Sequence, residues 1–230
     1  MPYTRPKSLK RVWYAVGGRI SRVGERLGID WLIYNPIIFR AFHEVALSSA
    51  PGVIRTFQAV FPGARRYVDV GAGSCAFAAE ALRRGLACAA CEYSPVARRL
   101  GKKQGVDVRP FDLTRTPPAQ LDGPFDLAYC FEVAEHVPEP MGRDLVKFIA
   151  SLAPLVVFTA APPGQKGHGH INLQPKEYWI GQFASHGFAH RSDLSKRVSD
   201  SFAREDVISW LVENVMVFER GGAPAGNGPS

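Results

Sequence analysis

The sequence predicts an α/β protein whose mostly parallel sheet is covered by helices on both faces. Short apolar runs alternate with helical patterns from Tyr67 onward, which is typical of a parallel sheet. The first run, Tyr67–Val70, breaks into the glycine turn Gly71-Ala72-Gly73, and an alanine-rich helical stretch follows at once. An acidic residue, Glu92, ends the second run. The chain has 230 residues, enough for one buried domain and an extension.

The first 30 residues form a basic segment, with seven Arg or Lys residues against two acidic ones. The net charge of the whole chain is +7, so most of the basic excess lies in this segment. Apolar residues recur there at gaps of three and four, which predicts one face of a helix: Leu9, Trp13, Val16, Ile20, Val23 and Leu27. This helix either packs on the domain or brings residues 8–30 to a membrane surface or an anionic polymer. We expect a basic helical extension over residues 1–45.

The remaining elements follow from apolar runs and from the positions of proline and glycine. Residues 31–61 are expected to be helical, with Pro51 at the start of a second helix. Further helices are expected at 76–84, after Pro95, at 140–152 and at 175–185. Strands are expected at 67–70, 86–92, 106–111, 125–131, 155–159 and 214–218. The tail at 221–230, rich in Gly, Pro and Ala, is expected to be disordered.

Cysteine usage and hydropathy indicate a cytoplasmic protein. The four cysteines lie in apolar strand or turn contexts, which favours a reducing compartment: Cys75, Cys88, Cys91 and Cys130. Cys88 and Cys91 form a CxxC pattern, but strand spacing points their side chains to opposite faces, against a metal or redox pair. No uninterrupted apolar run is long enough to span a bilayer, and the N-terminus lacks the apolar region of a secretory signal.

Acidic residues follow the second and third strands, at the edge of a parallel sheet where ligands bind. Glu92 is placed to accept hydrogen bonds from both hydroxyls of a ribose; the alternative is a structural acid at a strand end. Asp112 is placed to accept from the amino group of adenine; the alternative is an ordinary turn aspartate. These features fit S-adenosylmethionine (SAM) or a dinucleotide. Dinucleotide sites need a third glycine where Ala76 stands, whereas methyltransferases carry an acidic residue before the turn, here Asp69.

Taken together, these motifs resemble those of the class I SAM-dependent methyltransferases, over roughly residues 45–220. The motifs are Val68–Cys75, Cys91–Ser94, Phe111–Leu113 and Phe125–Pro138. The resemblance implies a Rossmann-like, doubly wound, seven-stranded sheet whose last strand is antiparallel, in a methyltransferase domain over residues 46–220. It also implies SAM as cofactor, with these contacts: Asp69, Gly71, Ala72, Gly73, Glu92, Tyr93, Asp112, Leu113 and Phe131. Cys75 departs from the pattern, since the family often has a third glycine there.

Two acidic residues and a histidine, Glu132-x-x-Glu135-His136, follow the fourth strand. If a helical turn begins there, the three side chains share a face and could bind Mg²⁺ or Mn²⁺. The pattern resembles the metal-binding motif of quinone-biosynthesis O-methyltransferases and of small-RNA 2′-O-methyltransferases. It is also similar to methyltransferases without a metal, in which His136 shapes the pocket and Glu135 caps a helix. His136 and Glu135 are therefore candidate catalytic residues, with His136 as general base or substrate contact.

A glycine-rich loop with two histidines follows the fifth strand and should reach the same sheet edge. His168 and His170 are candidate substrate contacts, and Tyr178 with Trp179 could form an apolar or sugar-stacking wall. The alternative is a solvated loop with both aromatic residues in the core.

The function that these features favour is SAM-dependent O-methylation of a small molecule or a saccharide. An RNA 2′-O-methyltransferase is the first alternative, but nucleic acid is not favoured because the domain shows no evident basic stripe. A nicotinamide-dependent oxidoreductase is the second alternative, and both Ala76 and Asp69 argue against it. A non-catalytic binding module is the third, and the intact set of cofactor residues argues against it.

Overall fold

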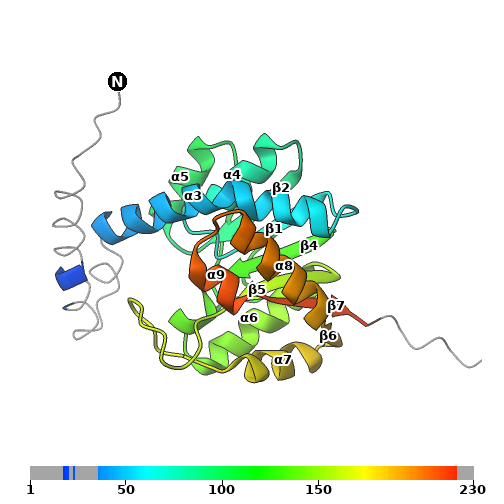
Figure 1. The fold of residues 1–230 in the computed structure, drawn as a ribbon. Coiled ribbons are helices and arrows are strands. Elements are labelled where there is room, and N and C mark those ends of the chain that lie inside the picture. The colour runs from blue at the N-terminus through cyan, green and yellow to red at the C-terminus, as the bar shows by residue number, and fades with distance from the viewer. Residues whose placement is uncertain (1–17, 21–22, 24–35, 222–230) are drawn as a thin grey trace, which may run out of the picture.

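A seven-stranded sheet forms the centre of the protein in the computed structural model, which describes residues 18–20, 23 and 36–221 (Figure 1). The strands lie in the order β3-β2-β1-β4-β5-β7-β6. Their bounds are β1 Arg66–Val70, β2 Ala87–Glu92, β3 Asp107–Pro110, β4 Leu127–Phe131, β5 Leu155–Thr159, β6 Phe188–His190 and β7 Met216–Arg220. β7 runs antiparallel to β5 and β6, and the other neighbouring pairs are parallel. The predicted Rossmann-like sheet with an antiparallel last strand is confirmed.

Helices cover both faces of this sheet (Figure 1). Their bounds are α3 Pro36–Val60, α4 Ala76–Arg83, α5 Pro95–Lys103, η1 Ala134–His136, α6 Glu139–Leu152, α7 Lys176–Ala184, α8 Ser192–Arg204 and α9 Ser209–Asn214. α3, α4, α8 and α9 pack on one face, around buried residues such as Phe57 and Phe202. α6 and α7 pack on the other face, around buried residues such as Ile149 and Trp179. Within the part of the chain that the structure describes, no helix is long and apolar enough to cross a membrane.

The side chains of each strand alternate between the two faces, so that one strand contributes to both cores. In β1, Tyr67 belongs to the core under α3, whereas Val68 and Val70 belong to the core under α6. In β2, Cys88 and Cys91 likewise lie in different cores. The prediction that these two cysteines point to opposite faces is therefore confirmed.

Some predicted elements differ from the structure. The expected helix start at Pro51 is wrong, because α3 is one helix with Pro51 inside it. Val53 and Phe57 on the next turns are fully buried, and tertiary packing of this face keeps the helix continuous across the proline. The last strand begins at Met216, since Asn214 still belongs to α9. The sequence pattern predicts none of β6, α8 or α9.

The basic N-terminal segment and the tail lie mainly outside the described residues. Residues 18–20 and 23 are helical, as the spacing of apolar residues predicts. Contact of residues 8–30 with a membrane surface, the extension over 1–45 and the disordered tail at 221–230 stay predictions. α3 crosses the predicted domain boundary at residue 45 without a break.

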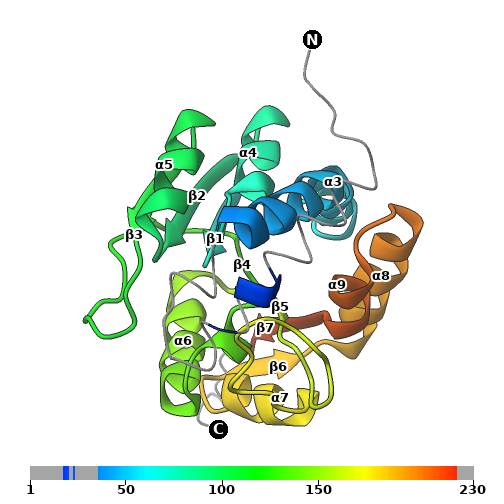
Figure 2. The ribbon, with the colours of Figure 1, turned by 90° about the vertical axis from the view of Figure 1, so that its left-hand side faces the viewer.

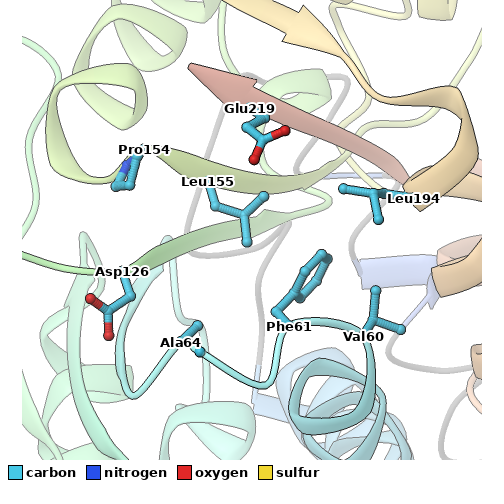
Figure 3. Close-up of a pocket in the computed structure, with 9 residues that line it drawn as sticks. Val60, Phe61, Ala64, Asp126, Pro154, Leu155, Leu194 and Glu219 are labelled. Carbon is cyan, nitrogen blue, oxygen red and sulfur yellow. The ribbon is translucent and has the colours of Figure 1, made fainter. Parts of the chain in front are cut away.

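A shallow apolar hollow lies at the amino ends of β4 and β5 (Figure 3). Asp126, directly before β4, and Leu155, the first residue of β5, line it together with Phe61 and Glu219. Ligands of parallel α/β sheets bind at the opposite edge, beyond the carboxyl ends of the strands. This hollow is therefore separate from the strand ends that carry the predicted site residues.

Candidate functional site

The glycine turn after β1 is fastened to the end of β2. Both the Gly71 and the Ala72 N–H donate to the carbonyl of Cys91, at 2.9 and 3.1 Å. Gly71 has φ +73° and Gly73 has φ +51°, in the left-handed region that favours glycine. A Cβ on Gly71 would lie 2.5 Å from a methyl group of Val133, whereas a Cβ on Gly73 would meet no atom within 4 Å. Gly71 therefore serves packing, whereas the space beside Gly73 is open, and contact of either glycine with SAM stays a prediction.

Glu92 ends β2 directly beside this turn. Its Oε2 accepts from the Gly73 N–H and its Oε1 from the Ser94 N–H, each at 2.7 Å. The side chain is 9% exposed, and burial raises the pKa of its carboxyl group. A carboxylate oxygen has two acceptor positions, so each oxygen can still accept one more hydrogen bond. These two remaining acceptor positions on the Glu92 carboxylate suit the two neighbouring hydroxyl groups of a ribose.

Cys75, the departure from the family pattern, has a glycine partner on α5. Cys75 has φ +59°, a left-handed conformation that is unusual for a residue with a side chain. A Cβ on Gly101 would lie 2.5 Å from the Cys75 Sγ. Gly101 therefore makes room for the thiol, and the turn keeps its left-handed backbone without a third glycine.

The residues predicted to hold adenine have different surroundings. Tyr93, next to Glu92, is 68% exposed and can offer its ring to a base. Leu113 packs against the core under α6. The Asp112 carboxylate accepts from the backbone and hydroxyl of Thr114 and from Arg115, as in the alternative of an ordinary turn aspartate. Its contact with adenine stays a prediction.

Two further predicted cofactor residues lie in the core. Asp69 is 3% exposed, and burial raises the pKa of its carboxyl group well above the usual range. Phe131 packs against Phe57 and Phe77, with ring centroids 6.3 and 5.4 Å apart. Phe131 thus packs on α3 and α4, and direct contact of Asp69 or Phe131 with SAM stays a prediction.

Glu132 lies outside the helical turn that follows β4. The expectation of a shared helix face for Glu132, Glu135 and His136 is wrong, since η1 begins at Ala134 and Glu132 has φ +53°. The Glu132 carboxylate instead accepts hydrogen bonds from the side-chain amides of Gln165 and Asn214.

Two amide residues that hold Glu132 are not predicted by any sequence pattern. Gln165 lies in the glycine-rich loop after β5, where polar side chains are common. Asn214 lies at the end of α9, and no local pattern singles it out.

Glu135, His136 and His170 form a three-residue cluster at the carboxyl end of β4. Each of the three offers a ligand atom within 4.8 Å of the others, and His170 takes the place that the sequence suggested for Glu132. Glu135 is fully buried, and neither of its carboxylate oxygens has a hydrogen-bond partner among the described residues. Burial and the neighbouring Glu132 raise the pKa of Glu135. A cation is one partner that would satisfy such a carboxylate.

The two histidines of this cluster have defined ring orientations. His136 Nδ1 lies 3.2 Å from the carbonyl of Gly169, and His170 Nδ1 lies 3.3 Å from the carbonyl of Gln165. A carbonyl can only accept, so in both rings Nδ1 carries the proton and Nε2 is the acceptor nitrogen. A Cβ on Gly167 would lie 2.1 Å from His170 Nε2, so this glycine makes room for the ring.

The loop between β5 and α7 brings these histidines to the site. In Figure 2 it is drawn yellow and lies below the first turns of α3. His168 meets Phe42 of α3 edge to face, with ring centroids 6.5 Å apart. The Tyr178 hydroxyl donates to Glu139 of α6, and Trp179 is fully buried. Trp179 therefore belongs to the core, whereas substrate contacts of His168, His170 and Tyr178 stay predictions.

The strand order, the antiparallel β7 and the glycine turn at the end of β1 define the class I SAM-dependent methyltransferase fold. The sequence profile of a methyltransferase-domain family matches residues 41–161, just over half of the chain. The chain belongs to this methyltransferase family.

Curated relatives are also named as methyltransferases. An uncharacterized methyltransferase from Mycobacterium sp. (strain KMS) is 27% identical over 148 residues, which cover 63% of this chain and 52% of the relative. The methyltransferase from strain JLS has the same identity and coverage. The chain thus spans about half the length of the curated relatives it matches.

Solved structures share the fold at low sequence identity. A sugar N-methyltransferase from Streptoalloteichus sp. ATCC 53650 has a TM-score of 0.60 at 16% identity, covering 80% of this chain and 91% of that one. An amino pentose methyltransferase from Micromonospora echinaspora, solved with SAM, has a TM-score of 0.60 at 16% identity, covering 80% and 97%. The magnesium protoporphyrin IX methyltransferase from Synechocystis PCC 6803 has a TM-score of 0.60 at 13% identity, covering 86% and 100%. At these identities the likeness shows a shared fold.

Proposed function

We propose that the chain transfers the methyl group of SAM to a hydroxyl group of a small molecule or a saccharide. The observation that carries this proposal is the Glu92 carboxylate, held beside the open Gly73 backbone with acceptor positions to spare. A nucleoside across the ends of β1 and β2 would place its ribose on Glu92 and its sulfonium near Gly71 and Gly73. The solved neighbours are named as methyltransferases of sugars or of a porphyrin, which supports an acceptor of this size.

In this reaction an acceptor oxygen forms a bond to the methyl carbon while the bond from that carbon to sulfur breaks. The enzyme contributes mainly by holding the two reactants in line. The acceptor hydroxyl also loses its proton, and His136 is the proposed base. Burial, with His170 as a second cause, lowers the pKa of His136 to about 4, so the imidazole is neutral near pH 7. Its Nε2 can therefore take up the proton.

Binding of SAM in preference to NAD⁺ is the first expected outcome. Titration calorimetry of the full chain should give a clear heat of binding with SAM and none with NAD⁺ under the same conditions. The reason is Ala76, which stands where a dinucleotide site needs its third glycine. Comparable affinities for the two ligands would favour the oxidoreductase alternative. Transfer of radioactive methyl from SAM to RNA, with none to sugars or phenols, would favour the RNA alternative.

As the alternative to His136 as base, we propose a divalent cation at Glu135, His136 and His170, since the lone pair of His136 Nε2 either binds a cation or takes up a proton. A carboxylate and two imidazoles fit Mn²⁺ better than Mg²⁺, which prefers oxygen ligands alone. A cation here would supply a positive charge that lowers the pKa of a bound acceptor hydroxyl. The buried Glu135 carboxylate would gain a positively charged partner.

Binding of Mn²⁺ is expected to depend on His170 and to be insensitive to His168. His170→Ala removes one of three ligands and should weaken Mn²⁺ binding by about tenfold to 100-fold, measured by calorimetry. His168→Ala is the matched control, because it changes a histidine two residues away that packs on Phe42. Gly167→Ala should also weaken Mn²⁺ binding, since the added methyl group displaces the His170 ring. Equal effects of the two histidine variants would exclude this cation site.

A further inference from the structure

Glu132, Gln165 and Asn214 form a closed ring of side-chain hydrogen bonds that the proposed reaction does not use. Asn214 Nδ2 donates to Glu132 Oε1 at 3.2 Å and to Gln165 Oε1 at 3.0 Å. Gln165 Nε2 donates to Glu132 Oε2 at 3.2 Å. We call these three residues the amide ring. It joins the end of β4, the loop after β5 and the end of α9, which are far apart in the sequence.

The amide ring has one arrangement of donors and acceptors. The carboxylate of Glu132 can only accept, so both amides must turn their NH₂ groups toward it. The oxygen of Gln165 then accepts the second N–H of Asn214. An apolar side chain at position 214 would remove both N–H donors at once, the one on Glu132 Oε1 and the one on Gln165 Oε1.

The backbone of Glu132 supports the same orientation. Its φ of +53° is a left-handed conformation that side chains rarely adopt, and its N–H donates to the carbonyl and hydroxyl oxygens of Thr159. Asn214 is 3% exposed. Well-packed apolar residues usually stabilise a buried position at least as well as a polar network. The buried amide of Asn214 faces a carboxylate on a strained backbone. This arrangement therefore indicates that the amide ring fixes the position of its members instead of adding stability.

Gln165 connects the amide ring to the histidine cluster. Its side chain belongs to the ring, while its main-chain carbonyl accepts from His170 Nδ1 at 3.3 Å. Loss of the ring would release Gln165, and with it the carbonyl that orients the His170 imidazole. The other end of the loop is held by the N–H groups of Ile171 and Asn172, which donate to the carbonyl of Glu135.

We infer that Asn214 is a positioning residue, which holds the loop after β5 so that His170 faces Glu135 and His136. It acts through Glu132 and Gln165, from α9, which contributes no residue to the cluster of Glu135, His136 and His170. The relevance of this positioning role to catalysis rests on the proposed function. The test of the positioning role needs neither SAM nor an acceptor. Its result can therefore be interpreted even if the proposed function is wrong.

Hydrogen–deuterium exchange of the full chain tests this role. Asn214→Leu and Gln165→Met each remove hydrogen bonds of the amide ring and should speed exchange at Ile171 and Asn172 about tenfold. Exchange in β1 and β4 should stay unchanged. The double variant should exchange no faster than the faster single variant, because the ring acts as a unit. Lys176→Met is the matched control: it removes a bond from Nζ to the carbonyl of Glu213 without touching the ring.

Two results would overturn the inference. One is loop exchange that stays at the wild-type rate in both single variants. The other is equal acceleration in β1 and β4, which would mean that Asn214 only stabilises the fold. If Asn214→Leu does not fold, Gln165→Met carries the test alone, because Gln165 is only half-buried in a loop.

Discussion

Replacing Glu92 with alanine is expected to weaken SAM binding about 100-fold or more, because two charge-assisted hydrogen bonds to the ribose are lost. Glu92 is fixed in place by the amides of Gly73 and Ser94, so its carboxylate is already oriented before a ligand arrives. Little ordering is then needed on binding, which increases the share of each hydrogen bond that appears as affinity. Titration calorimetry of the wild type and Glu92→Ala with SAM measures the effect.

Asp112→Ala is the matched comparison for this experiment. The Asp112 carboxylate already holds Thr114 and Arg115 in its own turn, and its side chain is half-buried. Its loss should therefore weaken SAM binding by about tenfold or less. Thermal unfolding of both variants shows whether each is folded. An unchanged affinity in Glu92→Ala, or the same loss in both variants, would contradict a ribose on Glu92.

The pH dependence of SAM binding gives a second check on Glu92. Burial raises the pKa of its carboxyl group more than the hydrogen bonds from Ser94 and Gly73 lower it. A protonated carboxyl no longer accepts from both hydroxyls, so affinity should fall as the pH drops through this raised pKa. The amide of Glu92→Gln does not titrate over this pH range. The variant should bind SAM more weakly than the wild type, with an affinity that does not change with pH.

The parts of the fold that the sequence predicted are those with a strong local signal. β5 is a continuous apolar run, and its bounds match the prediction at both ends. β6 has three residues, too few for any periodicity, and α8 is polar over most of its surface with Val198 and Phe202 buried. Their positions depend on packing against β7 and α3, which lie far away in the sequence.

The residues of the candidate site also divide into those with a local sequence signal and those without one. The glycine turn and Glu92 could be predicted together, because the carboxyl ends of neighbouring parallel strands meet at one edge. The spacing of Glu132 and Glu135 predicts a shared helix face only if a helix starts at Glu132, whereas η1 begins at Ala134 and the Glu132 carboxylate accepts from Gln165 and Asn214. Asn214 and Gln165 could not be found, since their partners are set by long-range contacts alone.

Gly71→Ala is expected to lower the free energy of unfolding by about 2–5 kcal/mol, the sum of a left-handed backbone and an overpacked methyl group. Its φ is +73°, and the new Cβ would lie 2.5 Å from Val133. Gly85→Ala is the matched control, with φ +77° and no atom within 4 Å of the new Cβ. It should lower the free energy of unfolding by about 1–2 kcal/mol, the backbone contribution alone. Denaturant unfolding measures both.

Val133→Ala separates the two contributions at Gly71. It removes both methyl groups that the new Cβ would meet, so Gly71→Ala on this background should cost about as much as Gly85→Ala. A full loss of stability in the double variant would show that Val133 is not the obstacle.

Gly73→Ala should separate binding from stability. Its φ of +51° gives the same backbone cost as at Gly85, and its new Cβ also meets no atom within 4 Å. The methyl group would project into the space where the proposed SAM site needs close approach to the backbone. We expect a stability close to that of Gly85→Ala, with SAM affinity weakened about tenfold or more by steric exclusion. Normal SAM binding in Gly73→Ala would place the cofactor elsewhere, even if Gly71→Ala behaves as expected.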